Sequence, residues 1–443
     1  MSLLTPRLLL TGLALTTCVT LAACSSAPPA TTPPAQSPAS AAATPESREV
    51  SSLNPRLLYA HAGGLVLLDT VTGDVVHSED RSGFLRLNSA GDGRHIVVTD
   101  GDTFRVFDAG IRARGHGDHD HYYESDPQMT AQTFAAPRAG HVVAHDGWTT
   151  LFADGTGEIW SMPSDQISDP GPLVRTARTE APHHGVAVVL ADDSLLTTQG
   201  TEEARSVVQV LKDGAVVTQT DACPGSHGEA AAKPTEAGDV ILVGCSDGPV
   251  VYRDGAFHKV TPPDSYARTG NAAGSPVSPV VLTDYKSDKD AEFERPTRVA
   301  LVDTRTEKLT LVELGSAYWF RSLARGPQGE ALVLTYDGHV NVIDPDSGKV
   351  TAQIDAVAPW TENTEWQQPG PAIKTAGNFA YVTDAANKKL VVIDLTSKAV
   401  TRTFDLAHAP VEIAVATGKP DAHGEADDDH DDHDHSATPH AHG

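Results

Sequence analysis

Three histidines recur along this chain at a constant interval, and that interval constrains the fold more than any other feature. His141, His184 and His227 follow one another at 43 residues. From residue 55 to 417, short runs rich in Val, Ile, Leu and Thr alternate with turn pairs such as Asp-Gly and Ser-Gly. A period of about 40 to 50 residues with four short strands per unit is typical of a β-propeller blade. The chain is therefore predicted to be all-β, folded as a single β-propeller.

The same interval predicts about eight four-stranded blades, with seven as the alternative if the weak units around residues 266–315 are divided wrongly. Blades are expected to begin near Phe84, His141, His184, His227, Val277, Phe320 and Ala372. Residues 56–82 supply only the outer strands of a further unit, and residues 411–417 form a lone strand at the C-terminal end. We expect this strand to join the N-terminal blade and close the ring, which removes exposed edges. A closed ring needs no second subunit, so a monomer is predicted.

The first residues predict export. Arg7 precedes an apolar run, residues 8–23, that is too short to span a bilayer and ends in small residues. The stretch Leu21-Ala22-Ala23-Cys24 matches a bacterial lipobox, so residues 1–23 are expected to be a lipoprotein signal peptide and Cys24 the lipidated residue. The alternative is an ordinary signal peptide followed by an incidental cysteine. We expect an extracytoplasmic protein that contacts the membrane through its lipid anchor only, on the outer side of the cell membrane.

The remaining chain divides by composition into three parts. Residues 24–54 are rich in Ser, Ala, Pro and Thr and are expected to be a flexible linker. Residues 55–418 form the predicted propeller, and residues 419–443 a His/Asp-rich tail without apolar residues to bury. The formal net charge of -26 argues against a nucleic-acid partner, which would require clustered Lys and Arg.

The exported domain keeps two cysteines, Cys223 and Cys245. Outside the cytoplasm two cysteines are expected to pair. We predict a disulfide between neighbouring strands that stabilises the fold by roughly 3 kcal/mol. A catalytic or redox role is the weaker alternative, because no Cys-x-x-Cys spacing is present to lower a thiol pKa.

The densest chemical signal is the segment 115–124, Gly-His-Gly-Asp-His-Asp-His-Tyr-Tyr-Glu. His116, His119 and His121 are candidate metal ligands there. In an extended segment His119 and His121 project to the same side and can reach one ion. We expect the segment to follow the last strand of the second blade and to precede the third.

The second signal is the periodic set His141, His184 and His227. Each is expected near the start of its blade, on the strand that lines the central channel, so that three successive blades direct an imidazole at one wall. Imidazole nitrogens bind zinc at about 2.0 to 2.1 Å. The alternative is a set of channel histidines that are hydrogen-bonded to water, and His183 and His145 are weaker candidates.

The C-terminal tail carries six further histidines among acidic residues. It is predicted to act as a flexible accessory chelator that raises the local metal concentration. A solubilising acidic tail is the alternative. The candidate ligands are His423, His430, His433, His435, His440 and His442. Because imidazole and carboxylate are available without a free thiol or Met cluster, Zn²⁺ is favoured over Ni, Co and Cu(II).

Three stretches carry a family resemblance: Gly-Asp-His-Asp-His at 117–121, Pro-His-His-Gly at 182–185, and Cys-Pro-Gly-Ser-His-Gly-Glu at 223–229 with Gly-Cys-Ser-Asp-Gly at 244–248. Together they resemble the AztD-type zinc metallochaperones, extracytoplasmic propellers that work beside an ABC-type zinc importer. The resemblance implies a high-affinity zinc site in the propeller and transfer of the ion to the solute-binding protein of the importer. It also implies that the histidine-rich loop serves as a flap or an entry site over the channel.

The chain is therefore predicted to be a zinc-binding metallochaperone and not an enzyme. One alternative is a metal-dependent propeller enzyme, a hydrolase or lyase, in which Glu229 is the only nearby carboxylate worth testing as a base. The other is a cell-surface binding scaffold, which the low aromatic content of 5% disfavours.

Overall fold

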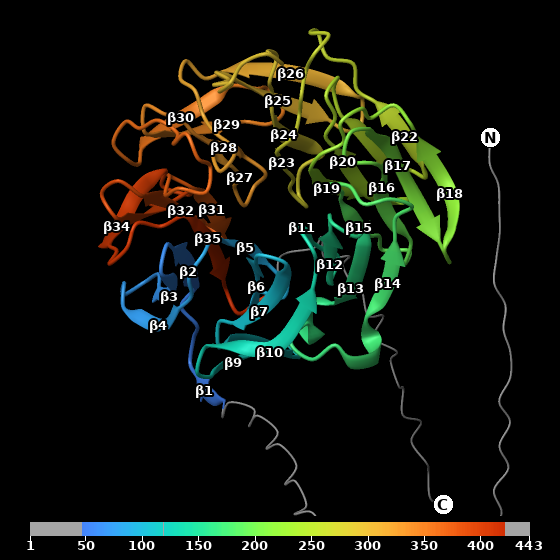
Figure 1. Ribbon diagram of the computed structural model, residues 1–443. Coiled ribbons are helices and arrows are strands. Elements are labelled where there is room, and N and C mark those ends of the chain that lie inside the picture. Colours follow the sequence, from blue (N-terminus) through green and yellow to red (C-terminus); the bar gives the residue numbers. More distant parts are fainter. Residues whose placement is uncertain (1–46, 118, 421–443) are drawn as a thin grey trace, which may run out of the picture. The chain divides into compact units, whose positions relative to one another are not determined.

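The computed structural model describes residues 47–117 and 119–420, which form nine antiparallel sheets (Figure 1). Eight sheets have four strands each and follow one another around a ring, as the blades of a β-propeller do. The ninth has three strands, so the number of sheets differs from the eight predicted. The helices of the described residues are two short 3₁₀ turns, Ser164–Gln166 and Gly171–Leu173. Across the same residues, no helix has the length and apolar character that crossing a membrane requires.

The blades use nearly all of the strands. From the innermost strand outward, the first four blades are β35 (Glu412–Ala416), β2 (Arg56–His61), β3 (Gly64–Asp69) and β4 (Val75–Asp80); β5 (Leu85–Ser89), β6 (His95–Asp100), β7 (Thr103–Asp108) and β10 (Gln128–Ala135); β11 (Ala139–His145), β12 (Trp148–Ala153), β13 (Glu158–Pro163) and β14 (Arg175–Arg178); and β15 (Ala187–Val189), β16 (Leu195–Gly200), β17 (Arg205–Lys212) and β18 (Ala215–Thr220). The last four are β19 (Glu229–Thr235), β20 (Gly238–Val243), β21 (Val250–Arg253) and β22 (Ala256–Lys259); β23 (Ala272–Ala273), β24 (Val280–Asp284), β25 (Arg298–Asp303) and β26 (Lys308–Glu313); β27 (Leu323–Arg325), β28 (Ala331–Leu334), β29 (His339–Ile343) and β30 (Val350–Asp355); and β31 (Ile373–Ala376), β32 (Phe379–Asp384), β33 (Lys389–Asp394) and β34 (Ala399–Asp405). The innermost strands begin within five residues of the predicted blade starts.

The C-terminal strand β35 belongs to the same sheet as the N-terminal strands. It pairs antiparallel with β2 over five residues, from Arg56 opposite Ala416 to Ala60 opposite Glu412. Strands β3 and β32 are buried on both faces and are almost entirely apolar, as central strands of packed sheets are, whereas the outermost strands β4 and β34 are largely exposed or half-buried.

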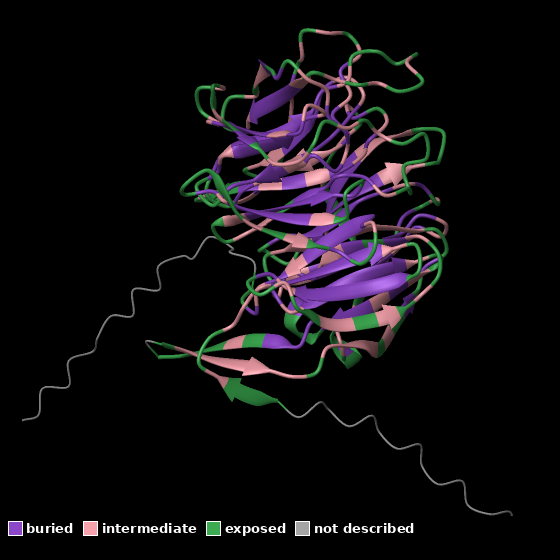
Figure 2. Ribbon diagram, turned by 90° about the vertical axis from the view of Figure 1, so that its left-hand side faces the viewer, coloured by how far each residue is buried: buried purple, intermediate pink, exposed green. Residues whose placement is uncertain are grey.

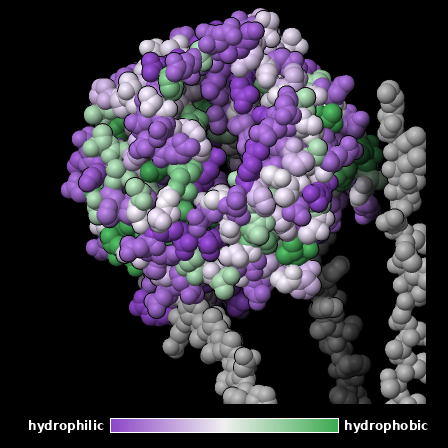
Figure 3. All heavy atoms as spheres, viewed as in Figure 1, coloured by the Kyte–Doolittle hydropathy of each residue, from purple (hydrophilic) through white to green (hydrophobic). Residues whose placement is uncertain are grey.

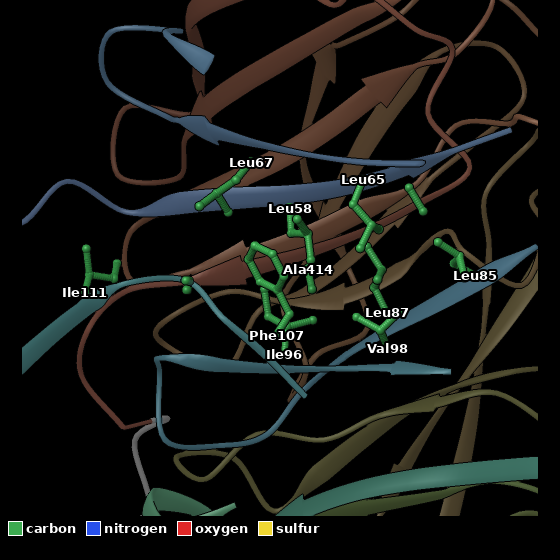
Figure 4. Close-up of a cluster of buried hydrophobic side chains, with 13 residues drawn as sticks. Leu58, Leu65, Leu67, Leu85, Leu87, Ile96, Val98, Phe107, Ile111 and Ala414 are labelled. Carbon is green, nitrogen blue, oxygen red and sulfur yellow. The ribbon is translucent and has the colours of Figure 1, made fainter. Parts of the chain in front are cut away.

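The core lies between neighbouring blades. In the cluster shown in Figure 4, Leu58 and Leu67 of the first blade face Val98 and Phe107 of the second, and all four are buried. Full burial of such a side chain stabilises the fold by roughly 1.5–3 kcal/mol. Repeated at each blade boundary, this packing fixes the innermost strands that surround the central cavities.

The three-stranded sheet is an insertion within the second blade. It consists of β1 (Arg48–Val50), β9 (His119–Glu124) and β8 (Ile111–His116), and the hairpin β8–β9 lies between the third and fourth strands of that blade. The prediction that this segment follows the last strand of the blade was therefore wrong. Strand β1 also falls in the region predicted to be a flexible linker. In Figure 2 the sheet lies beside the stacked blades, with most of its residues exposed or half-buried.

Both ends of the described chain contact this hairpin. At the N-terminal end, Arg48 lies opposite Glu124 of β9 and forms an ion pair with it at 2.8 Å. At the C-terminal end, the Ala113 N–H donates to the Gly418 carbonyl at 2.6 Å, and Lys419 Nζ donates to Asp120 Oδ2 at 2.6 Å.

Cys223 and Cys245 form the predicted disulfide, and both are buried. Cys223 lies in the connection that follows β18, and Cys245 follows β20 in the next blade. The bond thus joins two loops of neighbouring blades, and it fixes the connection that carries His227.

Candidate metal centres

The periodic histidines come together at the centre of the ring. His141 lies in β11, while His184 and His227 lie in the connections just before the innermost strands β15 and β19. The prediction that all three lie on innermost strands was thus right for His141 alone. Gly228 follows His227 with φ +73°, and a Cβ there would meet the Gly270 carbonyl oxygen at 2.4 Å. This close backbone approach, which requires glycine, holds the His227 connection against the next blade.

The three imidazoles converge on one point. His141 Nε2 and His184 Nε2 are 3.3 Å apart, and the ring centroids of the three residues are separated by 4.8 to 5.6 Å. One ring nitrogen from each residue can be chosen so that all three lie within 4.8 Å of one another. We call His141, His184 and His227 the channel triad.

Each imidazole of the channel triad has a neighbour at its other nitrogen, Nδ1. His184 Nδ1 lies 2.5 Å from Asp154 Oδ2, and His227 Nδ1 donates to the Gly270 carbonyl at 2.6 Å. His141 Nδ1 lies 3.4 Å from Glu229 Oε2. A partner that accepts a proton at Nδ1 leaves the lone pair on Nε2, which is the arrangement of a metal-ligating histidine.

The environment keeps two of these rings, those of His141 and His227, neutral. Burial, followed by the charge of His184, lowers the pKa of His141 to about 3. Burial, followed by the charges of His141 and His184, lowers the pKa of His227 to about 2. A metal binds neutral imidazole, so no proton has to leave these two rings at neutral pH.

Glu229 behaves differently from a metal-binding carboxylate. Burial raises its pKa to about 8, and its buried Oε2 has no hydrogen-bond partner. The group is therefore mostly protonated at neutral pH. The donor set that remains is three imidazoles, which fits Zn²⁺ with one coordination position open.

The channel triad borders two cavities. One, of about 240 Å³, is lined by all three histidines together with Glu229, and the other, of about 360 Å³, by His184 and His227 together with cationic and aromatic side chains. Figure 3 shows that the visible face of the ring is largely hydrophilic and is hollowed near its centre.

The second predicted set also comes together. His116 of β8 pairs across the hairpin with His119 of β9, and His119 Nε2 lies 3.2 Å from His121 Nε2. His119 and His121 thus lie close together on one extended strand, as predicted. Glu49 of β1 places Oε1 2.6 Å from His121 Nδ1. We call His116, His119 and His121 the hairpin triad; its ligand atoms also lie within 4.8 Å of one another.

The two triads lie at opposite faces of the ring. In an antiparallel four-stranded blade, the connection between the third and fourth strands is at the face opposite to the connections that enter the innermost strands. The hairpin triad lies in the connection between the third and fourth strands of its blade, β7 and β10. His184 and His227 lie in connections that enter innermost strands, β15 and β19. The hairpin is therefore no flap over the mouth nearest the channel triad.

The weaker candidates have structural partners instead. His183 is buried, with Nε2 2.9 Å from Thr198 Oγ1 and Nδ1 3.0 Å from the Ala181 carbonyl. His145 Nε2 lies 3.0 Å from Asp239 Oδ1. Neither residue joins a triad.

Three residues around the triads were not predicted: Asp154, Gly270 and Glu49. Gly270 follows His227 by 43 residues and so occupies the next position of the histidine series. The 43-residue period could therefore have predicted that Gly270 lies beside the triad. Asp154 follows β12 in an ordinary turn sequence, and nothing in that sequence indicates a role beside the triad. Cys24 and the six tail histidines lie outside the residues that the structure describes.

Known proteins resemble this chain in sequence and in fold. No family model matches the chain. The chain is 26% identical over 385 residues to the zinc chaperone AztD of Citrobacter koseri, a match that covers 83% of this chain and 88% of that protein. The structure of apo AztD from the same organism has a TM-score of 0.69 at 21% identity, covering 83% of this chain and 99% of AztD.

Two further structures show the same fold. A second crystal structure of Citrobacter koseri AztD gives a TM-score of 0.71 at 23% identity, covering 84% of this chain and all of that one. The dihydro-heme d1 dehydrogenase NirN gives 0.52 at 12% identity, covering 82% of this chain and 75% of that one. The resemblance to AztD is thus confirmed, while the likeness to NirN shows that the fold is also found in an oxidoreductase.

Proposed function

We propose that this chain, similar to the zinc chaperone AztD in sequence and fold, is a metallochaperone that holds Zn²⁺ outside the cytoplasm and passes it to the solute-binding protein of a zinc ABC transporter. The observation that carries the proposal is the channel triad. Three imidazoles converge on one point, and hydrogen-bond partners at the Nδ1 atoms of His184 and His227 leave the Nε2 atoms of these two rings free to bind a metal. Zinc is the cargo of this site, and no chemical step is required of it.

Metal content and competition affinity test the proposal. The complete exported chain, dialysed against a mild chelator, is expected to keep one tightly bound zinc. His184→Ala should lose it, because two imidazoles cannot hold zinc as tightly as three. His339→Ala is the matched control, since His339 lies in another blade beside Asp337 and Asp355. If His184→Ala kept its tightly bound zinc, the proposal would be wrong.

Transfer is tested by mixing the zinc-loaded chain with the zinc-free solute-binding protein. The hairpin triad is exposed, so we propose that it is a site where zinc is captured or released. Replacing His119 and His121 with Ala should slow loading or transfer and leave the tightly bound zinc in place. Unchanged rates would remove the hairpin triad from the pathway.

A hydrolytic zinc enzyme is the second candidate, since three histidines with an open position also hold catalytic zinc. Such an enzyme needs a base beside the metal, but Glu229 is mostly protonated at neutral pH because burial raises its pKa to about 8. We therefore expect no ester hydrolysis above that of free zinc. Hydrolysis that disappears in His184→Ala would favour the enzyme instead.

Export and lipid attachment remain part of the proposal. Residues 1–23 would be the signal peptide, Cys24 would carry lipid, and the tail histidines would serve as an accessory chelator. Fractionation of cells that express the wild type or Cys24→Ser tests the anchor. The wild type is expected in the membrane fraction and the variant outside it, and an unchanged distribution would exclude lipid attachment at Cys24.

A further inference from the structure

Cationic side chains surround the open side of the channel triad. The cavity of about 360 Å³ that His184 and His227 border is also lined by Arg86, Arg268 and Lys286. Within the described ranges 47–117 and 119–420, none of these three forms an ion pair with a carboxylate, although the chain carries a net charge of -26. Unpaired like charges repel one another, so their position beside a metal site requires an explanation.

The carboxylate among the residues lining this cavity, Asp284, forms no ion pair with Arg86 or Arg268. Asp284 is 2% exposed, and its Oδ1 accepts the backbone N–H groups of Gly270 at 2.7 Å and Asn271 at 3.0 Å. Its Oδ2 accepts the Asn271 side-chain amide at 3.2 Å. Asp284 is thus held by the backbone of its own blade, and burial raises its pKa.

The described part of the chain, residues 47–117 and 119–420, supplies no fourth ligand to the channel triad. In the described residues, the group of ligand atoms within mutual reach contains three histidines and no carboxylate or thiolate. Asp154 and Glu229 lie at the Nδ1 sides of His184 and His141, away from the point where the Nε2 atoms converge. Tetrahedral zinc requires four ligands. The described residues therefore leave the fourth position open to an external ligand.

The charges of this site favour an anion in that position. A divalent cation bound by three neutral imidazoles adds positive charge beside Arg86 and Arg268, which is unfavourable in a partly enclosed cavity. A guanidinium group matches the two oxygens of a carboxylate. Trp366 and Phe320 line the same cavity, and the Arg86 guanidinium lies 5.6 Å from the centre of the Trp366 ring, so there is room for a short organic anion.

We propose that the channel site binds Zn²⁺ together with an exogenous carboxylate, one oxygen of which is the fourth zinc ligand while the other is held by Arg86 and Arg268. The inference rests on the proposed function, because it takes the channel triad as the zinc ligands. Such an anion can be a free small carboxylate or a carboxylate side chain of the protein that receives the ion. In the second case, the carboxylate of the receiving protein replaces the free anion on zinc, and transfer begins without release of the bare ion.

Cobalt substitution tests this inference, because the visible absorption of Co²⁺ changes when a ligand of a tetrahedral site changes. The complete exported chain is loaded with one equivalent of Co²⁺ and titrated with acetate. We expect a saturable spectral change in the wild type. In the double variant Arg86→Gln/Arg268→Gln, the acetate concentration at half-saturation should rise at least about tenfold, as expected for loss of a charge-assisted carboxylate clamp. Arg305→Gln is the control, since Arg305 is paired with Asp303 at the surface.

The outcomes separate the two proposals. Absence of tightly bound Co²⁺ in the wild type would overturn the proposed function and this inference with it. Tightly bound Co²⁺ whose spectrum does not respond to acetate, or an equal response in the double variant, would overturn this inference alone. Arg86→Lys/Arg268→Lys, which keeps the charges, should lie between the two extremes and excludes a folding defect as the cause.

The source of the carboxylate is distinguished in acetate-free buffer. The zinc-free solute-binding protein is added to the cobalt-loaded chain at equal concentration. If the Co²⁺ spectrum first changes as it does with acetate, and the metal leaves the chain only afterwards, the fourth ligand is a carboxylate of the partner. Transfer without such a change, together with an acetate response, supports a free anion.

Discussion

At the scale of single residues, the ligands could be predicted from the sequence but the groups that orient them could not. His141, His184 and His227 share one period, and a period is visible in a single sequence. Asp154, however, lies 30 residues before His184 in the preceding blade, and the contact exists only because the two blades pack side by side. A pairing that depends on packing leaves no mark in local sequence.

Asp154 should set the zinc affinity of the channel triad. Asp154→Asn keeps the shape of the side chain but removes the charge that orients His184, so the affinity is expected to fall by about 10- to 100-fold. Competition titration with a chromophoric chelator measures it. Asp239→Asn is the matched control, because Asp239 makes a similar contact with His145 away from both triads; an equal loss in both variants would indicate a general defect.

The stability of the metal-free protein should fall as the pH is lowered from 7 to 4. Burial is the main cause that lowers the pKa of His141 to about 3 and that of His227 to about 2. At a pH between these values and the ordinary pKa near 6.5, both histidines are protonated in the unfolded chain but not in the folded chain, so lowering the pH favours unfolding. Each group contributes at most about 1.4 kcal/mol per pH unit. Urea unfolding at a series of pH values measures how steeply the free energy of unfolding changes with pH. This dependence should be weaker in the double variant His141→Asn/His227→Asn.

Glu229 should act in the opposite direction. Burial raises its folded pKa to about 8, above the ordinary value near 4.5, so its contribution to stability is present below pH 4.5 and is lost as the pH rises toward 8. Glu229→Gln, which stays neutral, is expected to remove this loss of stability between pH 4.5 and pH 8 from the same profile. A variant with the wild-type profile would show that Glu229 does not titrate in this range.

At the scale of elements, the regular blades were predictable and the inserted sheet was not. Hydrophobic runs and turn pairs marked the innermost strands to within five residues. The hairpin β8–β9 interrupts the second blade between its third and fourth strands, which cannot be distinguished in sequence from an extension at the end of that blade. Strand β1 is three residues long and gains its conformation only by pairing with β9.

Strand β1 should determine how well the hairpin triad binds metal. Glu49→Gln removes the carboxylate at His121 Nδ1, and the metal affinity of the hairpin is expected to fall by about tenfold or more. The channel triad, at the opposite face, should be unaffected. Arg48→Gln is the control, because Arg48 pairs with Glu124 rather than with a histidine. Equal binding in Glu49→Gln and the wild type would show that Glu49 does not position the ligand.

At the scale of the whole molecule, the pairing of β35 with β2 brings the two ends of the propeller sequence into one sheet. Ile413 of β35 is 1% exposed and packs in a cluster with Leu57 and Tyr381 of the first and last blades. Ile413→Ala should therefore destabilise the protein by about 2–5 kcal/mol. Val400→Ala, at a residue that is 40% exposed on an outermost strand, should change stability by less than about 0.5 kcal/mol.

Truncation tests the same pairing directly. Removal of residues 421–443 should leave the melting temperature unchanged, whereas removal of residues 411–443 should leave β2 with an open edge and cause aggregation. Equal behaviour of the two truncated chains would show that the ring does not depend on β35.

The meeting of both described chain ends at the hairpin has a mechanical consequence. If the chain is anchored through Cys24, the anchored segment enters the fold at β1, on the face that carries the hairpin triad. The opposite mouth of the ring, nearest His184 and His227, would then lie on the face that has no attachment to the membrane, where the anchor does not hinder a diffusing acceptor.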